Sequence, residues 1–173
     1  KYFEYYFGSY PNLLRKTRHS IAVLDGNESK TDLKNLGNDI FTYFGMGCRS
    51  VSKLLVPKGY DFDLLFNALF KFKGIINHNK YVNNYDYNKA VYLMSEQKFI
   101  ENGFVILKED GKLGSPIACL FFEYYENSKS LDTYISNIKD SLQCVVSNLN
   151  VPYSTSFGSS QKPKIDDYAD NID

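Results

Sequence analysis

Short apolar runs alternate with amphipathic stretches along this chain, and the alternation predicts strands separated by helices. Apolar runs of strand length lie at 20–24, 54–56, 104–107, 117–125 and 142–146. In most stretches between them, apolar residues recur every three or four positions, which is the spacing of one helix face. Strands separated by helices favour a parallel sheet covered on both faces. The pattern therefore predicts an α/β fold, with a predominantly parallel sheet and helices on both faces.

The first predicted helix leads into a glycine-rich loop. Its inner face carries four apolar residues at helical spacing: Leu33, Leu36, Ile40 and Phe44. Ser29 or Thr31 can act as its N-cap. The helix then delivers the chain to Gly45, so we expect the first strand and this helix to position the loop.

Three further helices are expected downstream. Apolar residues at 62–70 predict one that ends near Gly74. A polar and aromatic cluster at 83–89 leads into the next, whose apolar positions are Ala90, Leu93, Met94 and Phe99. The last helix carries Leu131, Ile135 and Ile138.

The first 14 residues differ from the rest in being rich in aromatic side chains. Tyr10-Pro11 predicts a turn there, because proline biases the residue before it away from helical geometry. We expect residues 1–14 to be an N-terminal docking segment and residues 15–173 to form a single domain. The sequence opens at Lys1 with no initiator methionine. A fragment of a longer protein is therefore expected.

Composition narrows the possible classes of protein. At 173 residues, 43% hydrophobic, the chain can bury a sizeable core. Its 20 basic and 20 acidic residues balance, which argues against a nucleic-acid or anionic-membrane partner. No apolar run approaches the length of a membrane span, and no signal peptide is evident. Three separated cysteines and two separated histidines suggest neither a disulfide framework nor a metal centre. A reducing cytoplasm fits this composition best.

Cys48 is the candidate nucleophile, because it stands in a loop between a predicted helix and a predicted strand. Gly45 and Gly47 leave the backbone around it bare enough for a substrate carbonyl to approach. A cysteine attacks as the thiolate, which nearby positive charge stabilises, and Arg49 and Lys53 follow directly. The alternative is that Cys48 is a small buried hydrophobic residue beside a helix cap. Cys119 and Cys144, inside apolar strands, are expected to be packing residues.

The stretch Arg15-Lys16-Thr17-Arg18-His19-Ser20-Ile21-Ala22-Val23-Leu24-Asp25, followed by Gly45-Met46-Gly47-Cys48, resembles a known family. It is similar to the long-chain acyl-CoA reductases related to the fatty-acid reductase of luminescence systems, a branch of the aldehyde dehydrogenase superfamily. The resemblance covers roughly residues 10–170. It implies the superfamily's catalytic domain, with the nucleotide-binding domain that precedes it and the final C-terminal strand both absent from this chain.

The resemblance also implies a reaction. Cys48 would take an acyl group from acyl-CoA, and hydride from NADPH or NADH, bound mainly by a domain outside this chain, would reduce it to a fatty aldehyde. The Cys48 amide, with Gly45 and Gly47, would form the oxyanion-binding loop. The stretch matching the general-base glutamate of the hydrolytic relatives, Leu14–Arg18, holds no carboxylate. That departure suits a reductase, which has no water to activate, and would equally suit an inactive domain.

Further site residues follow from the resemblance. Three positions match cofactor-binding segments: Lys112, where the family has a ribose-binding glutamate; Pro116; and Phe157. Lys112 could bind a 2′-phosphate of the cofactor or be a solvated turn residue. Four residues are possible CoA contacts or site-lining residues: Arg18, His19, Arg49 and Asn84.

The expected partner is acyl-CoA or an acyl-protein thioester, and a homodimer is plausible by analogy. Two rival functions stay open. One is a non-catalytic α/β scaffold, and the other is an aldehyde or semialdehyde dehydrogenase that works in the oxidative direction.

Overall fold

The computed structural model describes residues 2–12, 17–165 and 167, and within them the chain forms a seven-stranded sheet in the order β3-β4-β5-β2-β1-β6-β7. Neighbouring strands are parallel, except for the antiparallel pair β3 and β4. The strands are β1 (His19–Val23), β2 (Val51–Pro57), β3 (Ile100–Glu101), β4 (Ile106–Glu109), β5 (Cys119–Tyr125), β6 (Leu142–Val146) and β7 (Ser154–Thr155). The predicted α/β fold, with its mostly parallel sheet, is confirmed.

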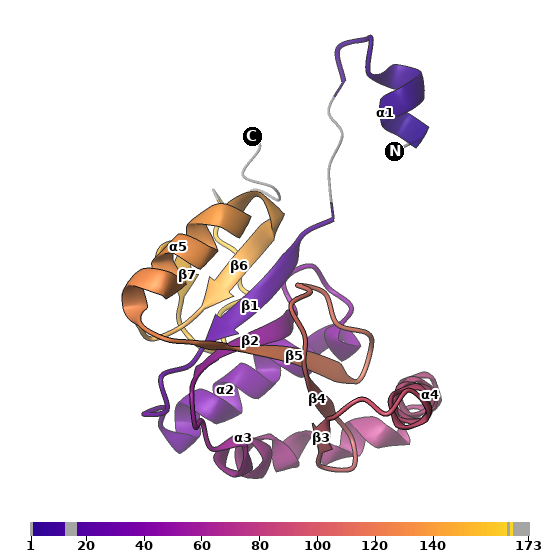
Figure 1. Ribbon diagram of the computed structural model, residues 1–173, viewed down its shortest axis with the longest axis vertical. Helices are drawn as coiled ribbons and strands as arrows, with labels where there is room; N and C mark the ends of the chain where they lie inside the picture. The colour runs from indigo at the N-terminus through magenta and orange to yellow at the C-terminus, as the bar shows by residue number, and fades with distance from the viewer. Residues whose placement is uncertain (1, 13–16, 166, 168–173) are drawn as a thin grey trace.

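Helices cover both faces of this sheet (Figure 1). The α-helices are α1 (Tyr2–Phe7), α2 (Lys30–Phe41), α3 (Phe62–Leu69), α4 (Asn79–Met94) and α5 (Ser128–Ile138). Three short 3₁₀ segments follow α2, α3 and α5: η1 (Thr42–Gly45), η2 (Phe70–Asn77) and η3 (Lys139–Ser141). Among the described helices, none combines the length and apolar character needed to cross a bilayer.

The core has two layers because successive strand residues face opposite sides of the sheet. Ala22 and Leu54 pack on the side covered by α2, α3 and α4. Ile21 and Leu55 pack on the other side, against Leu131 and its neighbours on α5. Burying both faces explains why the strands appear in the sequence as continuous apolar runs.

Helix α2 begins as predicted but ends sooner. Ser29 is its N-cap, and it forms a capping box with Asp32, so Thr31 is inside the helix. The α-helix stops at Phe41, and the predicted inner-face residue Phe44 falls in η1. The chain therefore enters the cysteine loop through a kinked turn in which Tyr43 and Phe44 have non-helical backbone angles.

Other element boundaries correct the sequence predictions. The helix expected to end near Gly74 ends at Leu69, and η2 continues past that glycine. The polar cluster at 83–89 lies inside α4, whose buried residues are Tyr81, Tyr85, Asn88 and Tyr92. Leu93 and Met94, expected on its apolar face, are exposed. The strand expected at 104–107 begins at Ile106, and the two-residue strands β3 and β7 were not predicted.

The N-terminal segment contains α1, a helix that the aromatic composition did not predict. All six of its residues are exposed. Tyr10-Pro11 lies in a bend after it, as the proline predicted. Residues 13–16, which include Arg15 and Lys16 of the family-like stretch, fall outside the described residues, and so do Tyr168–Asp170.

Candidate active site

Cys48 lies in the loop between η1 and β2, and its side chain is exposed. The alternative prediction, a buried packing cysteine, is wrong for Cys48, whereas Cys119 and Cys144 are buried as expected. Burial raises the pKa of each of these two thiols from 9.0 to about 11. Cys48 is thus the one cysteine of the three that solvent and reagents can reach.

The turn that precedes Cys48 has an unusual backbone. Tyr43 and Phe44 have φ of 55° and 60°, and Gly45 follows with φ of 74°. Left-handed geometry costs a residue other than glycine on the order of 1–3 kcal/mol, and glycine far less. Such strain is found most often at functional sites, because the surrounding structure must hold it in place.

Hydrogen bonds from neighbouring elements fix the loop. The hydroxyl of Ser20, a buried residue of β1, donates to the Cys48 carbonyl at 2.9 Å. The Ser50 amide donates to the Gly47 carbonyl at 2.9 Å, and the Ser50 hydroxyl donates to Thr42 O at 3.3 Å. Within the part of the chain that the structure describes, no acceptor takes the amide N–H of Cys48. That N–H is therefore available to a ligand.

A cleft of about 430 Å³ opens beside the thiol. Its lining residues are Thr17, Arg18, His19, Gly45, Met46, Gly47, Cys48, Ser50, Ser52, Ser115, Ile117 and Gln143. None of these residues carries a carboxylate. Arg18 brings positive charge, and its Nη1 donates to Leu142 O at 3.1 Å. The cleft thus combines a thiol, an imidazole and a guanidinium without an acidic side chain.

The cleft lies at the amino ends of the parallel strands. His19 begins β1, Gln143 lies near the start of β6, and Ser115 precedes β5. Open parallel sheets usually bind ligands at the opposite edge, where helix N-termini provide positive dipole ends. At this edge the amide groups of the cysteine loop would be the hydrogen-bond donors to a ligand oxygen.

Gly114 leaves space for the His19 ring to lie close to the backbone at the wall of the cleft. A Cβ atom on Gly114 would lie 2.3 Å from Cε1 of the His19 ring, so only glycine permits this approach. No role for Gly114 was predicted from the sequence. Its close packing on a residue nearly a hundred positions away could not be seen locally.

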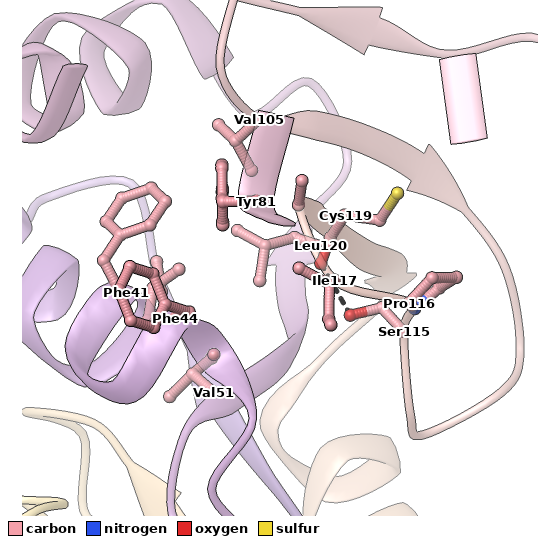
Figure 2. Close-up of a pocket in the computed structure, with 13 residues that line it drawn as sticks. Phe41, Phe44, Val51, Tyr81, Val105, Ser115, Pro116, Ile117, Cys119 and Leu120 are labelled. Carbon is pink, nitrogen blue, oxygen red and sulfur yellow. Dashed lines mark hydrogen bonds between the residues drawn. The ribbon is translucent and has the colours of Figure 1, made fainter. Parts of the chain in front are cut away.

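An apolar pocket adjoins the cleft (Figure 2) and shares Gly45, Ser115 and Ile117 with it. Most of its wall consists of apolar and aromatic side chains, from Phe41, Phe44, Val51, Tyr81, Val105 and Leu120. Its enclosed volume is about 20 Å³, enough for roughly one water-sized group. The Ser115 hydroxyl donates to Cys119 O at 2.6 Å and fixes the turn between pocket and cleft.

The structure contradicts the predicted role of Lys53 beside the thiol. Lys53 is fully buried in β2, on the face covered by α5, and its Nζ binds the Glu123 carboxylate. It also donates to Gly111 O at 2.9 Å and to the Tyr134 hydroxyl at 3.1 Å. Burial and the adjacent Glu123 carboxylate raise the pKa of Tyr134. Lys53 therefore joins β2, β5 and α5 rather than stabilising a Cys48 thiolate.

Arg49 also turns away from the cleft, toward the C-terminal block, the segment that contains Gly158, Ser160 and Asp167. Its guanidinium pairs with Asp167 at 2.8 Å and donates to Ser160 O at 3.4 Å. Buried Asp39 of α2 holds the same block by accepting hydrogen bonds from the Ser160 hydroxyl at 2.7 Å and the Gly158 amide at 2.6 Å. Burial raises the pKa of Asp39. Sequence analysis had not singled out this aspartate.

The remaining predicted site residues are dispersed. Arg18 and His19 line the Cys48 cleft. Lys112 is exposed in the turn after β4, and Pro116 borders the apolar pocket. Phe157 is only 6% exposed and packs in the core, so it offers no surface to a cofactor. The Asn84 amide donates to Lys80 O within α4, and Asn84 is not among the residues lining the cleft.

Sequence reasoning missed Ser20, Ser115 and Gln143, all of which shape the cleft. Ser20 did carry a signal, since a serine within an apolar strand requires a hydrogen-bond acceptor. Ser115 and Gln143 carried none, because their place depends on which strands are neighbours.

Comparison with known proteins finds similarity in structure only. No family model matches the chain, and no curated protein sequence does. A structure of an NAD-dependent aldehyde dehydrogenase from Sinorhizobium meliloti aligns at 11% identity with a TM-score of 0.48, over 84% of this chain and 34% of that one. Staphylococcus aureus AldH, in a substrate-bound state, aligns at 15% identity and TM-score 0.49, over 84% and 36%. The aldehyde dehydrogenase KauB from Pseudomonas aeruginosa gives 13% and 0.49, over 80% and 34%. The chain spans about a third of the length of these structures.

Proposed function

We propose that this chain carries the acyl-accepting cysteine of an acyl-CoA reductase, an enzyme that converts a fatty acyl thioester into a fatty aldehyde. The observation that carries the proposal is the presentation of Cys48. Its thiol is exposed in a cleft, on a strained loop, and its own amide N–H is unbonded within the described residues. A cysteine kept only for packing requires none of these features.

The first step would be acyl transfer. The Cys48 thiolate attacks the thioester carbonyl carbon, and a new carbon–sulfur bond forms while the carbonyl oxygen takes the negative charge. The unbonded Cys48 amide can donate to that oxyanion, and loss of such a donor typically costs about 100- to 1000-fold in rate. When the intermediate collapses, the bond to the CoA sulfur breaks, and CoA leaves as a thiolate that takes up a proton. An acyl-protein thioester presents the same carbonyl.

The surroundings of the thiol suit this step. Arg18 places a positive charge in the cleft, where it can stabilise a developing oxyanion. The pocket beside Gly45 and Ile117 has no charged groups in its lining, but its volume of about 20 Å³ is too small for an acyl chain, so the chain would have to lie along the cleft. The described lining of the cleft holds no carboxylate that could activate water, so the acyl-enzyme lacks an acidic group to promote its hydrolysis.

The described residues do not by themselves form a nicotinamide dinucleotide site. Phe157 is buried in the core, and Lys112 stands exposed where the resembling family has a glutamate. We therefore place the binding of NADPH or NADH mainly outside this chain. When bound, the reduced nicotinamide would supply the hydride that turns the acyl group into an aldehyde.

Acylation of the purified protein by palmitoyl-CoA tests the proposal. Intact-mass spectrometry should show one acyl group per chain, located on Cys48 by peptide mapping. Cys48→Ser should abolish the adduct, while Cys119→Ser, which changes a buried thiol, should leave it. Absence of acylation at Cys48 in a folded protein would reject the acyl-CoA reductase. Aldehyde oxidation by the full-length parent protein, without any acylation by acyl-CoA, would favour the oxidative dehydrogenase instead.

A further inference from the structure

A second cleft, of about 710 Å³, adjoins the Cys48 cleft and is lined by an excess of basic side chains. The two clefts share Arg18 and Gln143. The basic residues that line the second cleft are Arg18, Arg49, Lys139, Lys162 and Lys164. Asp140 and Asp167 are the acidic ones. This is a local concentration of positive charge in a chain whose charges otherwise balance.

Three of the cations are available to a ligand. Asp167 already pairs with Arg49, whereas no carboxylate in the described part of the chain forms a salt bridge with Lys139, Lys162 or Lys164. All three lysines are exposed. Exposed cations that line one concave surface raise the local concentration of anions there.

The same cleft offers groups that suit a nucleotide. Tyr153, 73% exposed, lines it with a ring on which a base could stack. Ser154, Thr155 and Ser159 add hydroxyl groups to its wall. Hydroxyls and lysines together are common ligands of phosphate oxygens.

The hollows around Cys48 lie in a fixed order. The apolar pocket meets the cysteine cleft at Gly45 and Ile117, and the cysteine cleft meets the basic cleft at Arg18 and Gln143. The apolar pocket is too small for a fatty chain, but the two larger clefts match an acyl-CoA, in which the thioester carbonyl is linked to a nucleotide that bears a pyrophosphate and a 3′-phosphate. We propose that the basic cleft binds the phosphates of the CoA nucleotide and so directs the thioester to Cys48. This inference rests on the proposed function.

Desulfo-CoA tests the cleft without any reaction at Cys48, because it keeps the nucleotide but has no thiol or thioester. Its affinity, measured by calorimetry, should fall roughly 10- to 30-fold in the variant K139Q/K162Q/K164Q, about two- to threefold for each exposed charge contact. The control K30Q/K34Q/K129Q removes three exposed lysines elsewhere and should bind like the unchanged protein. Binding should also weaken as salt is raised. Circular dichroism checks that both variants are folded.

The outcomes separate the two proposals. If desulfo-CoA does not bind, or binds K139Q/K162Q/K164Q and the control equally, the basic cleft is not its site. If NADPH binds there more tightly than desulfo-CoA, the nucleotide assignment is overturned. If desulfo-CoA binding depends on the three lysines but palmitoyl-CoA leaves Cys48 unmodified, the cleft stands as a nucleotide site and the acyl-transfer function fails.

Discussion

Replacing Lys53 by methionine separates the two roles that this residue could have. Methionine keeps most of the buried aliphatic volume but removes the charge that binds Glu123, Gly111 O and the Tyr134 hydroxyl. Breaking a fully buried ion pair costs about 3–5 kcal/mol. Glu123 is 35% exposed and can regain water, so we expect the lower figure of about 2–3 kcal/mol.

In a chain of this length, such a loss lowers the melting temperature by about 5–10 °C. Lys58→Met is the matched control, because Lys58 pairs with Glu126 at 3.2 Å in an ion pair whose side chains are 72% and 71% exposed. A pair of that kind contributes under about 1 kcal/mol. In the double variant K53M/E123L no buried charge is left without a partner, so its loss of stability should be smaller than the sum of the two single losses.

The decisive measurement is the rate at which iodoacetamide alkylates Cys48. Because Lys53 lies on the α5 face of the sheet, Lys53→Met should leave this rate unchanged within about twofold, at a temperature where the variant is folded. Slowing of Cys48 alkylation by tenfold, with no loss of stability, would show that Lys53 acts on the thiol and would refute the structural assignment.

Two further outcomes are expected. Gly114→Ala should displace the His19 ring and slow Cys48 acylation by about tenfold or more. Gly111→Ala is the control, because its added Cβ would have its nearest neighbour at 3.9 Å, and it should leave the rate unchanged. Equal acylation rates in the two variants would contradict the packing argument. Alkali should destabilise the fold, because burial raises the pKa of Cys119 and Cys144 to about 11, so the folded state holds these protons more tightly than the unfolded chain. Stability from each thiol is complete below about pH 9 and falls by up to about 3 kcal/mol between pH 9 and 11. Urea unfolding at pH 8 and pH 10 measures this loss, and a pH-independent midpoint would disprove it.

Local pattern determined much of this fold. The apolar runs at 20–24 and 142–146 correspond closely to β1 and β6, because a strand buried on both faces needs nearly every residue to be apolar. Ser29 was identified as a possible cap because capping chemistry acts within a few residues. The glycines that flank Cys48 likewise predicted an accessible loop, and the Cys48 side chain is exposed.

Tertiary structure decided what each charged or polar side chain does. Lys53 follows the cysteine loop in sequence, yet the pleat of β2 turns it toward α5 and a glutamate 70 positions away. Asn88 and three tyrosines are buried on α4, where Tyr81 and Asn88 donate to the carbonyls of Phe104 and Ile117 ahead of β4 and β5, although the helix has no strong apolar stripe. Hydrophobic spacing specifies which residues enter a core, since burial depends on local periodicity. The partner of a buried charge and the residues that line a cleft depend on which distant strands become neighbours. Local sequence patterns do not specify those neighbours, so only the folded structure shows these features.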